Sequence, residues 1–192
     1  MTDNEIFDIL RKTNVMKEGH FILTSGKHSD KYMQCAMLFQ YPEESKKCCD
    51  ALAEKILADG IKVDTVVSPA VGGILMGYQM SECLDVRNIF AERENGKMSL
   101  RRGFEVRPGE NIVVCEDVVT TGGSVKEVVA LLQEKGANVT CVCSIVDRSR
   151  GTADFGVPFK SLVEINFDTY EADECPLCKN GDNAVKPGSR NI

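Results

Sequence analysis

The strongest indication of the fold is the run Ile112-Val113-Val114-Cys115-Glu116-Asp117-Val118-Val119-Thr120-Thr121-Gly122-Gly123-Ser124. Its first apolar residues predict a buried strand, which ends in two adjacent carboxylates. A Thr/Gly loop then opens a predicted helix from Ser124 to Lys135, with Gly136 after its end. Ligands of open α/β sheets bind at the carboxyl ends of the parallel strands. The two acids and the loop therefore form the candidate binding site.

The chemistry of the loop favours a bound phosphate. Residues 120–124 offer hydroxyl groups, small side chains and bare backbone amides at a helix N-terminus, which together form a phosphate cradle. Glu116 and Asp117 would repel a phosphate in contact with them. They fit a ligand whose sugar hydroxyls, or a magnesium ion held through water, lie next to the phosphate. The alternative is a plain strand–turn–helix with Ser124 as N-cap, although two adjacent acids are a costly way to make only a turn.

Two other nucleotide-binding motifs are excluded. Gly72 and Gly77 have the glycine spacing of a P-loop, but Tyr78-Gln79 follows in place of Lys and Ser or Thr. The GxGxxG fingerprint of dinucleotide-binding folds is absent from the sequence.

Strands and helices alternate around this run. Apolar periodicity predicts helices at 4–12 (with Asp3 as N-cap), 42–58, 74–84 and 124–135, strands at 65–67, 88–91, 111–115 and 140–146, and short extended pieces at 21–23 and 31–35. This alternation predicts an α/β fold, a mostly parallel sheet flanked by helices. Residues 92–109 are polar, basic and poorly periodic, which indicates a functional loop or an exposed hairpin.

Length and composition exclude several classes of protein. The 192 residues predict a single domain, and the net charge of −6 argues against a general nucleic-acid binder. No apolar run is long enough to span a membrane, and the acidic N-terminus lacks the pattern of a signal peptide. We therefore expect a cytoplasmic protein without membrane or nucleic-acid partners. In that compartment, most of the nine cysteines are interpreted as small buried apolar residues.

The run at 112–124 resembles the phosphoribosyl-pyrophosphate motif of type I phosphoribosyltransferases. Other segments are similar to the orotate phosphoribosyltransferases within that family. These are the N-terminal segment Phe21–Ser29, the pair Asp147-Arg148 after a predicted strand, and a tail running from Cys175-Pro176-Leu177-Cys178 to Lys186-Pro187-Gly188-Ser189-Arg190. The resemblance covers nearly the whole chain.

The resemblance implies a single phosphoribosyltransferase domain over 1–192. Its core would span about 42–170, and a small hood would come from 1–41 and 171–192, with a flexible basic loop beside the site. The implied reaction joins orotate to 5-phosphoribosyl 1-pyrophosphate and gives orotidine 5′-monophosphate and pyrophosphate, in pyrimidine biosynthesis. Mg²⁺ is the implied cofactor, held mainly by substrate and water rather than directly by the protein. The implied assembly is a homodimer in which the loop reaches the neighbouring subunit's site.

The resemblance also implies roles for individual residues. Glu116 and Asp117 match the acids that hold the ribose hydroxyls, and Thr120 and Arg148 match the residues that contact orotate. Lys97, Asp117 and Glu116 are the implied catalytic residues. The residues implied to bind phosphoribosyl pyrophosphate are Lys27, Arg93, Lys97, Glu116, Asp117, Val118, Val119, Thr120, Thr121, Gly122, Gly123 and Ser124.

Arg148 and the segment Ser68–Gly73 each have a simpler explanation. A guanidinium fork suits the carboxylate and ring carbonyl of orotate, but Arg148 also fits a surface Arg at a strand end. Ser68–Gly73 matches the family's pyrophosphate loop, and it also fits a helix N-terminal turn that binds nothing. Some family members carry a Lys where this chain has Gly72, so that charge must come from elsewhere or be replaced by backbone amides.

The basic loop departs from the family pattern at one position. Arg93 and Lys97 keep the family's four-residue spacing between an Arg and the catalytic-loop Lys, but a His found two positions later in many members is Ser99 here. Cations of this loop would neutralise pyrophosphate and exclude water on closing. The alternative is a solvated, charged hairpin.

The remaining candidate residues are Lys27, two histidines and two cysteines near the ends of the sequence. Thr24 replaces a Lys found in some family members, and Lys27 is assigned a phosphate contact instead. His20 and His28 are interpreted as surface or structural residues rather than ligands. Cys175 and Cys178 have the spacing of half a zinc knuckle, but the sequence has no second CxxC. We favour a turn with free or oxidised thiols, and a second pair supplied across a dimer remains the alternative.

Two competing functions remain. One is a phosphoribosyltransferase for another base, which Arg148 and Phe21–Ser29 argue against. The other is a non-catalytic regulator that senses phosphoribosyl pyrophosphate and binds nucleic acid. The acidic charge and short chain leave little room for the basic face or extra domain that a regulator needs.

Overall fold

A computed structural model of the chain describes residues 1–23 and 25–187. Its elements in chain order are α1 (Asp3–Lys12), β1 (Met16–Ile22), β2 (His28–Met33), the 3₁₀ helix η1 (Cys35–Gln40), α2 (Pro42–Ala58), β3 (Thr65–Pro69), α3 (Gly73–Leu84), β4 (Arg87–Glu94), β5 (Lys97–Leu100), β6 (Asn111–Val119), α4 (Gly123–Glu134), β7 (Asn138–Asp147), β8 (Phe159–Glu164) and α5 (Pro176–Lys179). No helix among the described residues has the length and apolar character needed to cross a membrane.

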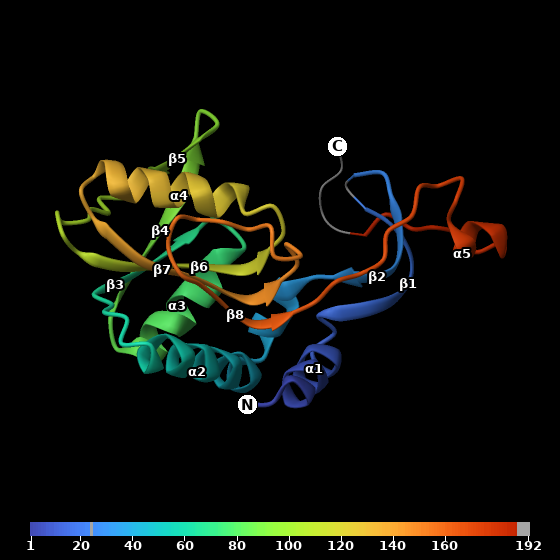
Figure 1. Ribbon diagram of the computed structural model, residues 1–192, viewed down its shortest axis with the longest axis horizontal. Helices are drawn as coiled ribbons and strands as arrows, with labels where there is room; N and C mark the ends of the chain where they lie inside the picture. The colour runs from blue at the N-terminus through green and yellow to red at the C-terminus, as the bar shows by residue number, and fades with distance from the viewer. Residues whose placement is uncertain (24, 188–192) are drawn as a thin grey trace.

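A six-stranded sheet with the order β5-β4-β3-β6-β7-β8 forms the centre of the molecule (Figure 1). The neighbouring pairs from β4 to β8 are all parallel, and only β5 runs antiparallel, as the second strand of a hairpin with β4. The predicted α/β class with a mostly parallel sheet is confirmed. Because β3, β6 and β7 are parallel neighbours, the loops after these strands meet at one edge of the sheet.

Helices cover both faces of the sheet. Figure 1 shows α2 and α3 on one side and α4 on the other. The central strands are buried on both faces, which explains the unbroken apolar runs Thr65–Val67 and Ile112–Cys115. Two apolar clusters result, one under α1, α2 and α3 and one under α4.

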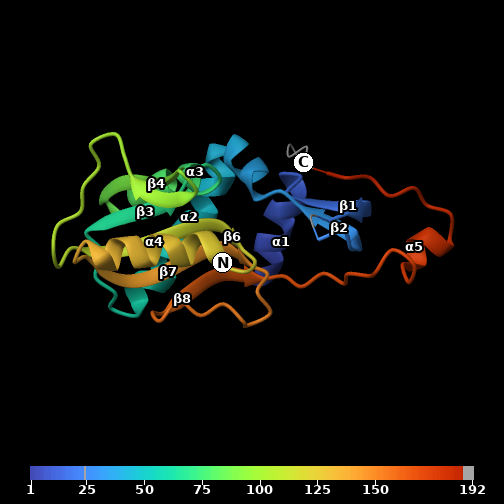
Figure 2. The ribbon, with the colours of Figure 1, turned by 90° about the horizontal axis from the view of Figure 1, so that it is seen from above.

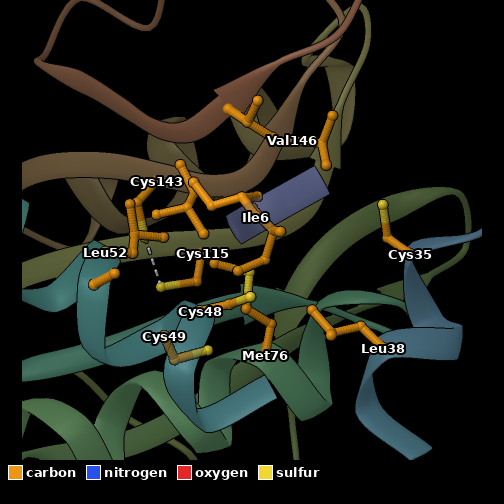
Figure 3. Packing of buried hydrophobic residues seen from close by; sticks show 14 of the residues in the cluster. Ile6, Cys35, Leu38, Cys48, Cys49, Leu52, Met76, Cys115, Cys143 and Val146 are labelled. Carbon is orange, nitrogen blue, oxygen red and sulfur yellow. Dashed lines mark hydrogen bonds between the residues drawn. The ribbon is translucent and has the colours of Figure 1, made fainter. Parts of the chain in front are cut away.

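Most cysteines are part of this core. Cys48 and Cys49 of α2 face Cys115 of β6 and Cys143 of β7 across the first cluster, where Met76 also packs (Figure 3). The Cys115 and Cys143 sulfurs are 3.1 Å apart, yet all nine cysteines are free thiols. Burial raises the pKa of Cys48 to about 12, so this thiol is inert at neutral pH. The prediction that most cysteines serve as small apolar residues is confirmed.

A second, two-stranded sheet lies at one end of the molecule (Figures 1 and 2). It is the antiparallel hairpin β1–β2, and the chain after β8 runs along it. Two isolated bridges join the hairpin to this later segment, His28 with Tyr170 and Phe21 with Val185. The tail residues 188–190 quoted above lie outside the described residues.

Several helices and strands begin or end at other residues than predicted. The N-cap of α1 is Thr2 rather than Asp3, because the Thr2 hydroxyl accepts the Glu5 amide and the Glu5 carboxylate accepts the Thr2 amide in a capping box. The strand predicted at 111–115 continues to Val119, so the two acids lie within β6 and not after it. The basic segment 92–109 includes the end of β4 and all of β5, which pair as a hairpin. Strand β8 and the short helix η1 were not predicted.

Candidate active site

Three loops converge at the carboxyl edge of the sheet. They follow β3, β6 and β7, which lie side by side. The loop after β3 directly abuts the acids of β6: a methyl group added at Gly72 would lie 3.6 Å from Asp117 Oδ1, and one at Gly73 would lie 3.1 Å from Glu116 Oε1. The loop after β7 is tied to the end of β6, because the Arg148 amide donates to the Val119 carbonyl at 2.8 Å. The sequence-predicted acids, Thr/Gly loop and Arg148 are thus brought together.

Glu116 and Asp117 are adjacent acids in a low-dielectric setting. Asp117 is buried, and its Oδ1 accepts the Val118 amide at 2.8 Å. Burial, reinforced by the neighbouring Asp117 charge, raises the pKa of Glu116 to about 8. Burial also raises the pKa of Asp117. The pair therefore holds a proton at neutral pH, and a ligand that donates hydroxyl hydrogens to both groups would favour its release.

The loop after β6 surrounds a small cavity of about 90 Å³. The cavity is lined by Glu116 and by the continuous segment 118–125, which includes the first turn of α4. The first amides of a helix lack intrahelical acceptors, so they are available to a ligand. Gly122 has φ +72°, and a methyl group there would lie 2.8 Å from the Phe155 ring, so only glycine fits this turn. The N-cap of α4 is Gly122, and Ser124 lies in the first turn of the helix, so Ser124 is not the N-cap.

Arg148 lies half-buried at the end of β7. Its guanidinium carbon is 4.7 Å from the centroid of the Phe167 ring. Burial lowers the pKa of this side chain, and no salt bridge within 1–23 and 25–187 involves it. A partly desolvated cation without a carboxylate partner is suited to an anionic ligand. Phe167 had not been predicted at the site, because a single aromatic residue after a strand carries no distinctive signal.

The loop after β3 is held close to the sheet by glycines. A methyl group added at Gly77 would lie 2.7 Å from Ser68 Oγ, so glycine allows α3 to approach β3. The Ala70–Val71 peptide bond in this loop is cis. With Gly72 in place of a lysine, this loop presents backbone and small side chains beside the acids.

Comparison with known proteins decides the family. A family model described as a phosphoribosyl transferase domain matches residues 36–174. The chain is 56% identical over 187 residues to the orotate phosphoribosyltransferase of Thermotoga maritima, covering 97% of this chain and 99% of that protein. It is 52% identical over 192 residues to the orotate phosphoribosyltransferase of Caldanaerobacter subterraneus subsp. tengcongensis, covering all of both.

The chain belongs to the orotate phosphoribosyltransferase family. Solved structures agree on the fold. The crystal structure of orotate phosphoribosyltransferase from Aeropyrum pernix matches with a TM-score of 0.67 and 23% identity over 83% of this chain and 93% of that chain. Leishmania donovani UMP synthase matches with a TM-score of 0.71 and 24% identity over 86% of this chain and 37% of that one. At these identities the likeness concerns the fold alone.

The hairpin β4–β5 carries two of the predicted site residues, Arg93 and Lys97, and they differ in their contacts. Arg93 forms a two-pronged ion pair with Glu127 of α4, with nitrogen–oxygen distances of 2.8 and 2.7 Å. This contact ties the hairpin to the helix that opens at the phosphate-sized cavity. Lys97 lies exposed near the hairpin tip, which projects from the sheet edge in Figure 1. Its side chain has no ion pair within the described ranges.

One further predicted residue, Lys27, lies in the turn between β1 and β2. Lys27 pairs with Glu171 at 2.8 Å, and both side chains are exposed. Among the described residues, no hydrogen bond or salt bridge joins Lys27, Arg93 or Lys97 to Glu116 or Asp117. Thr24 lies outside the described residues. Ser99 lies in β5, and its Oγ is buried and has no hydrogen-bond partner among the described residues.

Proposed function

We propose that the chain transfers the phosphoribosyl group of 5-phosphoribosyl 1-pyrophosphate to orotate, in pyrimidine biosynthesis. Membership of the orotate phosphoribosyltransferase family supports the reaction. The observation that carries the choice of base is Arg148, whose half-buried guanidinium has no carboxylate partner in the described chain and whose backbone amide bonds to Val119 at the end of β6. Orotate is planar and anionic, and it would supply the carboxylate that this fork lacks.

The proposed donor site is the carboxyl edge of β6. Glu116 and Asp117 would accept hydrogen bonds from the ribose hydroxyls. The segment Val118–Ser124 would hold the 5′-phosphate in its cavity through the free amides of the first turn of α4. Thr120 follows the last residue of β6 and would contact both the phosphate and the base. Together these contacts fix the C1′ carbon of the ribose in front of Arg148 and the bound base.

The chemistry is a substitution at C1′. The bond from C1′ to the pyrophosphate oxygen breaks, and its electron pair leaves with pyrophosphate. A bond from a ring nitrogen of orotate to C1′ forms, and the proton on that nitrogen is released. Positive charge develops on the ribose as the bond breaks, and the carboxylates of Glu116 and Asp117 stabilise it. Lys97, and Arg93 once released from Glu127, would neutralise charge on the departing pyrophosphate.

The proposed cofactor is Mg²⁺. Two carboxylates beside a phosphate site fit the way Mg²⁺ binds, with few protein ligands and several oxygens from substrate and water. Among the described residues, no group of three or more acidic, His or Cys ligands surrounds the β6 acids, so an all-protein cage is not formed there. Glu116 and Asp117 would hold the ion through water. When bound, it would supply charge neutralisation for the pyrophosphate group.

The proposed assembly is a homodimer. Val71, Leu75 and Tyr78 form an apolar stripe at helical spacing on and just before α3, and they are 83%, 54% and 64% exposed. A second copy of the chain would cover this stripe. Because the stripe begins in the loop after β3, an interface there would bring the neighbour's hairpin close to the site, as the shared-loop proposal requires.

We also propose that residues 1–41 and 171–192 act as a hood over a core at 42–170 within one domain, 1–192. The bridges from His28 to Tyr170 and from Phe21 to Val185 support a joint unit of these two segments. A cytoplasmic location is proposed as well, since nine free thiols suit a reducing compartment.

The decisive experiment is the loss of orotate absorbance when purified protein, phosphoribosyl pyrophosphate and Mg²⁺ are combined. Adenine, guanine, hypoxanthine and uracil serve as a base panel, with pyrophosphate release measured in each case. Turnover with orotate and little with the other bases is expected. Preference for a purine would assign a different transferase, and tight binding of phosphoribosyl pyrophosphate without turnover of any base would indicate a regulator.

A further inference from the structure

Two histidines and two cysteines from opposite ends of the chain meet beside the β1–β2 hairpin. The ligand atoms of His20, His28, Cys175 and Cys178 all lie within 4.8 Å of one another. Both histidines and Cys175 are buried, while Cys178 lies at the surface. We propose that these four residues bind one Zn²⁺ ion, at a site distinct from the carboxyl edge of the six-stranded sheet.

The distances fit a tetrahedral ion. His20 Nε2 is 2.8 Å from His28 Nδ1, 3.4 Å from the Cys175 sulfur and 3.7 Å from the Cys178 sulfur. The Cys178 sulfur is 3.3 Å from His28 Nδ1. Zinc–sulfur bonds of about 2.3 Å and zinc–nitrogen bonds of about 2.0–2.1 Å require ligand separations of about 3.3–3.8 Å. Adjustments of about 0.6 Å or less in these four separations, and of about 1 Å in a pair at the 4.8 Å limit, would admit the ion.

A backbone contact prepares one histidine for binding. His20 Nδ1 lies 3.0 Å from the Asp182 carbonyl, which accepts only from a protonated nitrogen. The ring proton is therefore on Nδ1, and Nε2 faces the other three ligands with a free lone pair. Metal-bound histidines commonly have this arrangement, in which the second nitrogen donates to a carbonyl and fixes the ring.

The ligand set selects the kind of metal. Two thiols and two imidazoles are the donors of structural zinc sites, whereas Mg²⁺ and Ca²⁺ take oxygen ligands. The four protein ligands complete a tetrahedron and leave no open position for substrate, so the site is structural. The second pair of ligands comes from the same chain, and not from a second CxxC across a dimer.

The surroundings explain what such an ion would do. In the described segment from Asp168 to Pro187, only Cys175 is buried, and the sole helix is the four-residue α5. The segment is fixed by backbone bonds at its two ends: the His28 amide donates to the Tyr170 carbonyl at 2.8 Å, and the Val185 amide donates to the His20 carbonyl at 2.9 Å. The loop between these bonds buries too little apolar surface to hold itself in place. A zinc ion would fasten its middle to the hairpin.

The competing explanation is a metal-free cluster in which His28 Nδ1–H donates to His20 Nε2 and the thiols pack against the rings. The first test is metal content. Untagged, reduced protein would be stripped with a chelator, reconstituted with Zn²⁺, desalted and measured by mass spectrometry of the element. One Zn²⁺ per chain is expected. Cys178→Ser and His28→Gln should lose it, and Cys83→Ser, which changes a free thiol on α3 outside the cluster, should keep it.

The second test does not depend on variants that fold. Co²⁺ added to the stripped wild-type protein should give the intense visible bands of a tetrahedral ion and a thiolate charge-transfer band, both displaced by one equivalent of Zn²⁺. Hydrogen exchange at the His28 and Val185 amides should slow on Zn²⁺ addition, because both amides flank the site. Failure of the reduced wild-type protein to take up either ion stoichiometrically would overturn the proposal. Uptake that Cys178→Ser and His28→Gln both leave intact would overturn it equally.

Discussion

The guanidinium of Arg148 rests on the ring of Phe167, 4.7 Å from its centroid, and makes no ion pair with any described carboxylate. The aromatic face fixes the plane of the fork without neutralising its charge. The backbone that carries this ring is held in place, because Arg150 donates to the Phe167 carbonyl at 2.8 Å and Ser29 donates to the Asp168 carbonyl at 2.9 Å. Arg148 is thus oriented for a planar anion.

This relationship predicts the effect of removing the fork. Arg148→Ala should raise the KM for orotate about tenfold or more, because a charge-assisted hydrogen bond contributes about 1.5–3 kcal/mol. The KM for phosphoribosyl pyrophosphate should change much less. Arg148→Lys should give an intermediate KM for orotate, since lysine keeps the charge and lacks the planar guanidinium. Steady-state kinetics with each substrate varied measures both constants, and equal changes in the two would show that Arg148 is structural.

The ribose contacts predict a binding defect without a folding defect. Asp117→Asn should weaken the affinity for phosphoribosyl pyrophosphate about tenfold or more, because a carboxylate acceptor becomes a weaker neutral one. Isothermal titration calorimetry with Mg²⁺ present measures the affinity, and circular dichroism checks the fold. Asp173→Asn, a change at an exposed acid of the C-terminal segment, is the control. Unchanged affinity of the Asp117 variant would remove this residue from the site.

The buried acid pair predicts how stability depends on pH. Unfolding lowers the pKa of Glu116 from about 8 toward the ordinary value of 4.5. Between these values the folded protein binds more protons than the unfolded chain, so the free energy of unfolding should fall as pH rises from about 4.5 to 8. Glu116→Gln should reduce this slope, with a remainder from Asp117, whose pKa burial also raises. It should stabilise the protein at pH 8 by a few kcal/mol, since one pKa unit corresponds to about 1.4 kcal/mol. Urea unfolding at several pH values tests this, and parallel slopes for both proteins would contradict it.

The exposed hairpin tip predicts complementation between subunits. Lys97→Ala should lower kcat strongly while substrates still bind, and Asp117→Ala should lose the ribose contact. If Lys97 acts across the interface, a mixed dimer of the two variants has one site with both defects and one with neither. Unfolding and refolding the two together should restore about a quarter of wild-type activity, because half of the dimers are mixed and each has one intact site.

Mass spectrometry of the intact assembly confirms that mixed dimers are present. If they form and the mixture stays inactive, Lys97 acts within its own subunit or not at all.

The apolar stripe predicts where the subunits meet. Leu75→Glu should convert the proposed dimer to a monomer, because it places a charge in the middle of the stripe formed with Val71 and Tyr78. Leu57→Glu, at an equally exposed leucine on α2, should leave the dimer intact. Sedimentation velocity distinguishes the two species, and a dimeric Leu75→Glu protein would place the interface elsewhere.

The sequence predicted those strands that are fully buried, because a buried strand is an unbroken run of apolar residues. The apolar runs of β3, β6 and β7 are buried on both faces, so they stood out against the polar loops. Strand β8 was missed because it is an edge strand, and only Leu162 and Val163 within it are buried. The acids, the Thr/Gly loop and Arg148 were found because each lies in the last residues of such a strand or directly after it.

The rest of the site depends on tertiary contacts that leave no local pattern. Nothing in the sequence near Arg93 indicates its ion pair with Glu127, thirty-four residues away. The half zinc knuckle was visible at Cys175 and Cys178, but the two histidines are single residues in a hairpin with no metal-binding spacing. Both histidines are buried against the cysteines, so of the expected surface or structural roles the surface one is wrong.

The pairing of the β1–β2 hairpin with the segment around Cys175 also constrains the order of folding during synthesis. His28 and Cys178 are separated by 150 positions, and His20 and Cys175 by 155. The hairpin therefore leaves the ribosome long before its partner segment exists, and all six strands of the main sheet are translated in between. A released chain truncated near residue 165 contains all six strands of the main sheet, and amides of its β1–β2 hairpin should exchange faster than in the full chain. The first strands to be made are thus among the last to be fixed in place.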